Sequence, residues 1–354
     1  MIENSMVGEL VPAAVDPVTA GRDVWSRFHE LRRVRQEELR PDDPLEPDEH
    51  VEFNMKRENP FEFHYWHEIA RDGVMLSWLN GEVVKPANPE YATNKHLYWA
   101  DAYVRPEHRR QGVASLWLPV LAELMDRHQC TVLGIGTEQE SGQRFLEWLG
   151  ANVKLVNIES RLKLSEIDWD MLERWNEEGA RRSPNTALEV YDGGPPESMW
   201  ADFAPQFTSM FNTMPLENLD LGDIIITPER LRDWADRRKQ SGEVLYTVLT
   251  REPDGEMSAV TEILWAPHRR TILHQEFTGV RPDARGRGLG KWIKAAMLLH
   301  LRAIYPDLEW VVTDNAHSNG PMLKINRTMG FKPYREQVEY QMTRSELEAR
   351  IRSL

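Results

Sequence analysis

The spacing of apolar residues switches between strand-like and helix-like along the chain, and both halves show a similar order of elements. In the second half, alternating or continuous apolar runs predict strands at 187–191, 243–250, 257–266, 270–280, 308–314 and 334–342. Helical spacing in the same half predicts helices at 199–210, 228–239, 289–303 and 321–329. The first half predicts strands at 8–15, 74–79, 97–104, 131–136 and 153–164, and helices at 24–39, 113–127 and 143–149. Antiparallel strands followed by alternating helices and strands are typical of an α+β fold.

Three connecting segments complete this pattern. The acidic, proline-containing stretch at 41–49 is expected to be a solvated loop. A helix is expected at 168–182, between the two halves. Thr343 and Glu346 have the spacing of a capping box at the start of a last helix.

One phrase occurs twice, each time between a predicted strand and a predicted helix. Residues 104–114 read VRPEHRRQGVA and residues 280–290 read VRPDARGRGLG, about half of the 354 residues apart. A turn of this kind aims several backbone N–H groups and the positive end of a helix at one point, which favours a phosphate. A repeat period of this length indicates a duplicated domain and not a solenoid.

Composition narrows the class of protein. The net charge of −14 argues against a protein built mainly to bind nucleic acid, and it is compatible either with a cationic substrate or with solubility alone. No apolar run approaches the roughly 20 residues of a membrane span, so no membrane partner is expected. The single cysteine, Cys130, cannot form an internal disulfide, and the first residues lack the pattern of a signal peptide. These features predict a cytoplasmic protein.

The repeated phrase resembles the motif (Q/R)-x-x-G-x-(G/A) of the GNAT superfamily, the Gcn5-related N-acetyltransferases. In that family the motif grips the pyrophosphate of acetyl-CoA. It is present here from Arg285 to Gly290 and from Arg109 to Ala114. A second family pattern, N-x-x-A-x-x-x-Y-x-x-x-G-F, is similar to residues 319–331, although methionine replaces its alanine and asparagine its tyrosine. Neither the dinucleotide fingerprint nor the P-loop pattern matches the chain.

The resemblance implies two tandem GNAT-like domains, each with a mixed, mostly antiparallel sheet flanked by helices. The similarity covers nearly all of residues 186–343 and, more weakly, residues 5–165. We therefore expect an N-terminal GNAT-like domain at 1–165, a connecting helix or linker at 166–185, and a C-terminal GNAT domain at 186–354. The sequence leaves open whether the chain acts alone or as a homodimer.

Glu276 is the candidate general base. It lies four residues before Val280, on the strand that feeds the second motif, where the first copy has Ala100. A carboxylate that is partly desolvated beside the acetyl group has a raised pKa and can take a proton from an amine. The alternative is that Glu276 pairs with an arginine across the sheet.

The resemblance also implies a set of residues that bind acetyl-CoA, the expected co-substrate. Backbone groups of Thr278, Gly279 and Val280 would face the acetyl and pantetheine groups. Asn319 would bond to the pantetheine arm, with a helix N-cap as its other role, and Asn326 would hold the thiol. The pyrophosphate would lie on Arg285, Gly286, Arg287, Gly288, Leu289 and Gly290.

Neither copy has the general-acid tyrosine that the family usually carries four residues before the glycine of the second pattern. Asn326 takes that place in the second copy and Leu146 in the first. Tyr334 is the nearest candidate acid, and water is the alternative. Pro119 also interrupts the motif helix of the first copy. We therefore expect a catalytic C-terminal copy and an N-terminal copy that is structural or holds the cofactor.

The resulting interpretation is an acetyl-CoA-dependent N-acetyltransferase that acts on a primary amine of a small molecule, with no metal. The rival hypothesis is a non-catalytic sensor of CoA or a scaffold with degenerate GNAT domains. The missing tyrosines favour the rival, whereas Glu276 and the intact second motif favour the enzyme. His64 and His67 could form half of a metal site, but an aromatic strand face explains them as well.

Overall fold

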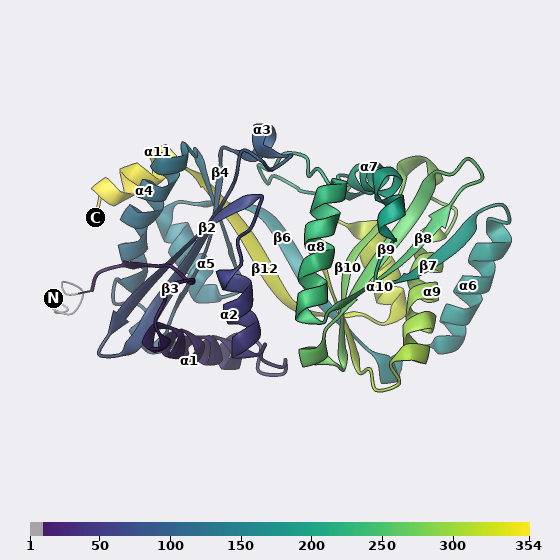
Figure 1. Cartoon of the computed structure of the whole chain (residues 1–354), viewed down its shortest axis with the longest axis horizontal. Coiled ribbons are helices and arrows are strands. Elements are labelled where there is room, and N and C mark those ends of the chain that lie inside the picture. The colour runs from purple at the N-terminus through teal and green to yellow at the C-terminus, as the bar shows by residue number, and fades with distance from the viewer. Residues whose placement is uncertain (1–9) are drawn as a thin grey trace. The chain divides into compact units, whose positions relative to one another are not determined.

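The computed structural model describes residues 10–354, which divide into two compact units (Figure 1). The first unit comprises the chain up to Leu155 together with Asn218–Gly222 and Gln337–Leu354. The second unit comprises Val156–Glu217 and Asp223–Glu336. These boundaries differ from the ranges expected from the sequence, because the last 18 residues, Gln337–Leu354, belong to the first unit.

The first unit is built on a sheet with the strand order β1-β2-β3-β4-β5-β12. Its neighbouring strands are antiparallel except for β4 and β5, which are parallel. The strands are β1 (Ala13–Val15), β2 (Glu62–Arg71), β3 (Val74–Val84), β4 (Leu97–Val104), β5 (Val132–Thr137) and the second part of β12 (Lys332–Thr343). The helices are α1 (Arg22–Leu39), α2 (Asp48–Lys56), α3 (Tyr91–Asn94), α4 (Trp117–His128), α5 (Glu140–Leu149) and α11 (Arg344–Arg352).

Apolar side chains hold α1 and α2 against this sheet. Trp25 and Phe28 of α1 pack in one cluster with Trp78 of β3 and Tyr103 of β4, and Met55 of α2 covers its edge. Burial of the apolar area of this cluster stabilises the packing of α1 and α2 on the sheet. Helices α4 and α5 lie against the other side of β4 and β5, where the cavity described below is formed.

The second unit repeats this design with the strand order β6-β11-β10-β9-β8-β7. Only β10 and β11 are parallel among the pairs of this order. The strands are β6 (Asn152–Lys163), β7 (Ala187–Asp192), β8 (Val244–Arg251), β9 (Met257–Trp265), β10 (Ile272–Val280) and β11 (Trp310–Ala316). The helices are α6 (Trp169–Arg182), α7 (Trp200–Phe211), α8 (Pro228–Ser241), α9 (Leu289–Ile304) and α10 (Gly320–Met329).

Two apolar clusters cover the two faces of the second sheet. Phe203 and Phe207 of α7 and Leu231 of α8 pack with Val260 and Phe277. On the other face, α9 supplies much of the larger cluster, and α6 packs along it. The helices of this unit are labelled in Figure 1.

The α+β class and the mostly antiparallel mixed sheets predicted from the sequence are confirmed. The capping box of Thr343 and Glu346 is present at the start of α11. The predicted loop at 41–49 is too long, because α2 begins at Asp48, where two acidic residues favour a helix N-terminus. The first residues of the strand predicted at 8–15 lie outside the described part of the chain. No helix of the described residues has the length and apolar character needed to cross a membrane.

Candidate functional site

The two copies of the repeated phrase form loops of the same conformation. Arg109 Nε donates to the carbonyl oxygen of Val104 at 3.0 Å, and Arg285 Nε donates to that of Val280 at 3.2 Å. The glycine before each helix, Gly112 or Gly288, has a φ of 86° or 89°. This left-handed conformation favours glycine. In the second unit Gly288 is followed directly by the N-terminus of α9, whereas in the first unit a 3-10 helix at Val113–Leu116 lies between Gly112 and α4.

The loops differ in the charge that they leave free. Both terminal nitrogens of Arg109 donate to the carboxylate of Glu38, at 2.6 Å each. Arg285 is exposed, and within residues 10–354 its guanidinium has no carboxylate partner. Because the charge of Arg109 is neutralised and that of Arg285 is not, the second loop has the stronger field for an anion.

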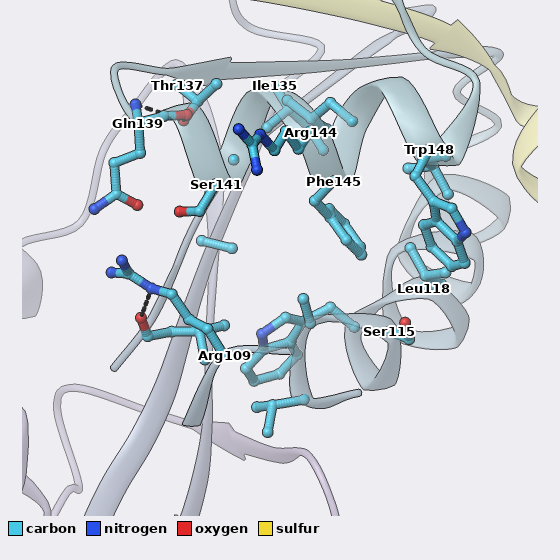
Figure 2. A pocket seen from close by; sticks show the side chains of 18 of the residues that line it. Arg109, Ser115, Leu118, Ile135, Thr137, Gln139, Ser141, Arg144, Phe145 and Trp148 are labelled. Atoms are coloured by element: carbon cyan, nitrogen blue, oxygen red, sulfur yellow. Dashed lines mark hydrogen bonds between the residues drawn. The ribbon is translucent and has the colours of Figure 1, made fainter. Parts of the chain in front are cut away.

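A cavity of about 530 Å³ lies beside the loop in the first unit, between α4, α5, β4 and β5. Arg109, Gln139 and Ser141 lie toward one end, and Leu118 and Trp148 lie toward the other (Figure 2). The hydrogen-bonded register of β4 and β5 runs from Leu97 to Ala100 on β4, and the cavity begins where it ends. Further lining residues are Val104, Arg110, Ser115, Leu121, Ile135, Thr137, Arg144 and Phe145.

The lining of this cavity has a definite chemical character. Three arginines line this cavity. No aspartate or glutamate is found among the described residues that line it. A ligand that is anionic at one end and less polar along its body would match such a surface. The first-unit cavity therefore fits a role in holding a ligand and offers no carboxylate as a general base.

The residues expected to bind the cofactor in the second unit are brought together around the start of α9. Gly286 has a φ of 81°, and Leu289 and Gly290 are buried in the first turn of the helix. A Cβ on Gly290 would approach Ile325 of α10 at 3.3 Å, so glycine allows a close approach here. Arg287 donates to Glu252 at 2.8 Å and to Thr186 at 2.7 Å, and its side chain therefore anchors the loop.

The strand that leads into this loop is irregular where the site residues lie. Between Gln275 and Thr278 the register of β10 against β9 shifts, so Glu276 and Phe277 stand opposite Glu262 alone. Such a bulge re-aims side chains and is common next to active sites. Thr278 Oγ1 bonds to Thr261 Oγ1 at 2.8 Å, and Gly279 and Val280 continue the strand to the loop.

Two asparagines of α10 have different surroundings. Asn319 is the N-cap of the helix, because its side chain accepts a hydrogen bond from the N–H of Met322 at 3.4 Å. Asn326 is 2% exposed, and its Nδ2 donates to Asn315 Oδ1 at 2.7 Å. Its Oδ1 is buried with no hydrogen-bond partner in the described chain. An unpaired buried acceptor is costly, so Asn326 fits a role in binding a donor group of a ligand.

Tyr334 lies on the exposed start of β12, with 40% of its surface accessible. The Arg161 guanidinium carbon lies 3.6 Å from the centre of its ring, and that of Arg335 lies 4.7 Å from it. Tyr334 does not line the cavity that contains Glu276. Its contacts are those of a residue held between two cations.

A second cavity, also of about 530 Å³, lies in the second unit between α7, α8 and strands β8–β10. Glu276 lines it, together with the carboxylates of Glu243 and Glu262 and the guanidinium groups of Arg237 and Arg238. Its remaining wall is largely aromatic, from Trp200, Phe203, Phe207, Phe211, Trp234 and Phe277. We call this the acidic cavity.

Two carboxyl groups of the acidic cavity, those of Glu262 and Glu276, have a pKa above that of a free glutamate. Burial raises the pKa of Glu262 to about 7, against the attraction of Arg238 and a hydrogen bond from Thr247 Oγ1 at 3.1 Å. Burial also raises the pKa of Glu276, with Asp314 and Glu243 adding to the effect and Arg269 opposing it. The side chain of Glu276 is exposed on the wall of the acidic cavity, so a substrate can reach it, and its raised pKa suits a general base. The alternative role of Glu276 was to pair with an arginine. Within the described residues Glu276 forms no ion pair.

Sequence reasoning missed several residues of these sites. Glu262 had one signal in the sequence, because it is a charged residue inside the largely apolar strand predicted at 257–266. Arg238 belongs to a short charged run that ends a helix and has no pattern of its own. Lys294 is 2% exposed in α9, and burial lowers its pKa to about 7. It stands four positions after Gly290, just as the cavity-lining Leu118 stands four after Ala114.

His64 has neighbours that the sequence did not predict. One ligand atom each of Glu62, His64 and Glu82 lies within 4.8 Å of the others, on β2 and β3. Burial and Glu62 raise the pKa of Glu82, while His64 lowers it. No ion-holding role follows from these distances alone, and the absence of a metal cofactor stays a prediction.

Comparison with known proteins shows which class of fold the chain has. Residues 25–151 match the model of the acetyltransferase (GNAT) family. A tandem GNAT protein from the clavulanic acid biosynthesis pathway superposes with a TM-score of 0.72 at 17% identity, covering 95% of this chain and 99% of that one. A GCN5-related N-acetyltransferase from Sphaerobacter thermophilus has a TM-score of 0.63 at 14% identity, with 95% and 96% covered. No curated protein matches the sequence.

The chain therefore has a tandem GNAT fold, as the resemblance implied. The family model matches the first unit, whereas the motifs in the sequence are closer to the family in the second.

Proposed function

We propose that this protein is an acetyl-CoA-dependent N-acetyltransferase that acts on a primary amine of a small molecule and does its chemistry in the second unit. The observation that carries the proposal is the position of Glu276. This carboxylate lines the acidic cavity, has a raised pKa, and lies on the strand that leads into the loop at 280–290. The match of residues 25–151 to the model of the acetyltransferase (GNAT) family supports the class of reaction.

The residues of the second loop fit the phosphate groups of acetyl-CoA. Gly286 and Gly288 have positive φ values, and the N-terminus of α9 follows them. The exposed guanidinium of Arg285 supplies a positive charge. Asn326 Oδ1, which is buried without a partner in the described chain, can accept a hydrogen bond from the pantetheine arm. When bound, acetyl-CoA supplies the activated acetyl group.

The acceptor amine would react from the side of the acidic cavity. Its ammonium form loses a proton to Glu276, directly or through water, and the neutral nitrogen attacks the thioester carbonyl. The C–N bond forms, the C–S bond breaks, and the sulfur leaves as a thiolate. The nitrogen then gives up its second proton and the thiolate takes one up. Because Tyr334 does not line the cavity, we assign this proton transfer to water. The β-bulge at Glu276 positions the base beside the reacting groups.

The first unit would hold a cofactor without reacting. Its cavity has arginines at the loop and no carboxylate among the described lining residues. The same lack of a base, and the asparagine at 326 in place of the family's tyrosine, favour the second candidate function. In that function the whole chain binds CoA as a sensor or scaffold and transfers no acetyl group.

Release of free thiol from acetyl-CoA, measured with a panel of primary amines, separates the two functions. We expect turnover with at least one amine, an acetylated product by mass spectrometry, and its loss in Glu276→Gln. Glu309→Gln is the matched control, because Glu309 is exposed and lies outside the acidic cavity. Binding of acetyl-CoA without turnover for any amine would favour the sensor or scaffold.

A further inference from the structure

Of the two arginines that line the acidic cavity among the described residues, Arg238 is the one without a direct carboxylate partner. It lies on α8 and is partly buried, and no residue among 10–354 forms a hydrogen bond or ion pair with its guanidinium. Burial lowers its pKa, while Glu262, Glu243 and Glu276 counteract this effect from a distance. An unpaired guanidinium in a partly buried wall is costly unless a ligand completes it.

The other charged groups of the cavity are already held. Glu243 accepts a hydrogen bond from Ser241 Oγ at 3.0 Å, and Glu262 accepts one from Thr247. Arg237 Nε lies 2.8 Å from a carboxylate oxygen of Asp233. This leaves one anion, Glu276, and one cation, Arg238, to meet a ligand.

The aromatic wall gives the ligand an apolar body. Phe277 contacts Phe207 and Phe211 with ring centres 5.3 Å and 5.2 Å apart, so these rings support one another. Trp200 Nε1 donates to the carbonyl oxygen of Pro195 at 2.8 Å, so its polar atom already has a partner within the protein. The cavity volume of about 530 Å³ is in the range of sites for small molecules.

We infer that the acceptor is a free amino acid with an apolar or aromatic side chain. Its carboxylate binds the guanidinium of Arg238, its amine faces Glu276, and its side chain lies on the aromatic wall. This inference rests on the proposed function, because it names the acceptor of the same cavity. A planar guanidinium matches a carboxylate through two parallel hydrogen bonds.

A simple amine has no carboxylate that could bind the guanidinium of Arg238. Its binding would leave the guanidinium desolvated and unpaired, which is the situation in which a site rejects an analogue strongly. An amino sugar would lack both the carboxylate and the apolar body. The combination of one free anion, one free cation and an aromatic wall therefore selects a zwitterion over either.

The test compares ligands that differ in one group, using the full chain and acetyl-CoA. L-Phenylalanine carries all three groups, 2-phenylethylamine lacks the carboxylate, and 3-phenylpropanoate lacks the amine. Wild type is compared with Arg238→Gln, with Arg238→Lys, and with Lys239→Gln. The last is a matched control that removes one charge from an exposed position of the same helix. Thermal unfolding of each variant verifies that it is folded.

We expect kcat/KM for L-phenylalanine to exceed that for 2-phenylethylamine by about 10- to 100-fold, the effect of one charged hydrogen-bonded pair. Arg238→Gln should raise KM far more for L-phenylalanine than for 2-phenylethylamine, so that this preference is lost, and it should abolish competition by 3-phenylpropanoate. Arg238→Lys should lie between, and Lys239→Gln should behave as wild type.

Equal kcat/KM for the two amines in wild type would overturn the inference and leave the N-acetyltransferase proposal standing. An equal loss for both amines in Arg238→Gln would overturn it as well. If no amine is acetylated but calorimetry detects 3-phenylpropanoate binding that depends on Arg238, the proposed reaction fails and the carboxylate site survives. If neither is seen, both are wrong.

Discussion

Arg109 and Glu38 form a two-point ion pair beside the first-unit cavity, with both terminal nitrogens of the arginine donating to the carboxylate at 2.6 Å. The hydroxyl of Tyr103 donates to the same carboxylate at 2.7 Å. Desolvation would raise the pKa of Glu38, but the hydrogen bonds from Arg109 and Tyr103 outweigh it and lower the pKa. The carboxylate is therefore ionised at neutral pH and competes with any phosphate for Arg109.

Glu38→Gln should raise the affinity of the first-unit cavity for CoA. Removal of one negative charge next to Arg109 is worth about 1 kcal/mol at a partly exposed site, or roughly five-fold in Kd. Calorimetric titration of CoA into this variant, at low and at high salt, measures the change. The gain should shrink at high salt, because exposed charges are screened.

The control for this prediction is Glu37→Gln, which removes the same charge from an exposed neighbouring position on α1. Unchanged affinity in both variants would show that Arg109 does not contact the ligand. Equal gains in both would show that only the net charge of the unit matters.

The pH dependence of acetylation should follow the pKa of Glu276. Its carboxyl must be ionised to act as a base, and its pKa is raised above the ordinary 4.5, so kcat/KM should rise with pH through that higher value. Glu243 raises this pKa and Arg269 lowers it. Glu243→Gln should therefore move the midpoint to lower pH, and Arg269→Gln should move it to higher pH.

The pair of opposite shifts separates Glu276 from the amine itself. Protonation of the free amine also lowers the rate at low pH, but it is the same for every variant. Comparison of midpoints with one amine cancels this contribution. Midpoints that coincide in wild type and both variants would mean that another group is the base.

Gly179 of α6 lies against the indole ring of Trp292 of α9. A Cβ at Gly179 would lie far inside van der Waals contact with Cγ of that ring. The indole cannot turn freely, because its Nε1 donates to Asn176 Oδ1 at 3.1 Å. Gly179→Ala should destabilise the protein by about 1–3 kcal/mol, the usual cost of overpacking.

Urea unfolding followed by tryptophan fluorescence measures this loss. Gly320→Ala is the comparison, since Gly320 has no atom within 4 Å of the position of a Cβ and has no positive φ. Equal stability of the two variants would mean that α6 moves away from α9 at little cost.

Lys294 should make stability depend on pH. Burial lowers its pKa in the folded state to about 7, below the ordinary 10.5, so the unfolded chain binds the proton more tightly. The stability of the wild type should therefore fall as the pH is lowered from about 10.5 to about 7. Lys294→Met removes this loss and should be more stable than wild type by about 1–3 kcal/mol at pH 6.

The advantage of Lys294→Met over wild type should disappear above pH 10.5, where the lysine is neutral in both states. Lys324→Met removes a charge from an exposed position and should show no such trend. A constant advantage at every pH would point to packing instead of ionisation.

The sequence predicted the parts of this protein that depend on local chemistry. The loops at 104–114 and 280–290 were predicted from their glycines and from the helix starts that follow them. Asn319 and Thr343 cap helices, as their positions in the sequence indicate. Glu276 was found because two copies could be compared position by position. Burial is the main cause of its raised pKa, as expected for a partly desolvated carboxylate.

Other features depend on contacts distant in sequence and were not predictable. The β-bulge at Glu276 exists only relative to β9, and Arg238 reaches the acidic cavity only because α8 packs on the sheet. The return of residues 337–343 to pair with β5 has no local signal, because a strand reads the same in either unit. The prediction of Tyr334 as the acid rests on its distance along the sequence, which does not determine the direction of its side chain.

The unit that holds acetyl-CoA can be decided with one pair of variants. Gly112 and Gly288 precede the helix of each loop with φ values of 86° and 89°. Aspartate tolerates this conformation better than most residues, so Gly112→Asp and Gly288→Asp mainly place a negative charge where a phosphate would bind. Each variant should therefore abolish binding at its own site and leave the other unit folded.

Calorimetric titration of acetyl-CoA into wild type and both variants gives the answer. We expect the tighter site to be lost in Gly288→Asp, because Arg285 is not neutralised as Arg109 is by Glu38. Amine acetylation should disappear in Gly288→Asp and persist in Gly112→Asp. Persistence of acetylation in Gly288→Asp would move the chemistry to the first unit, where the cavity contains no carboxylate among the described lining residues and the base would have to be water or the amine itself.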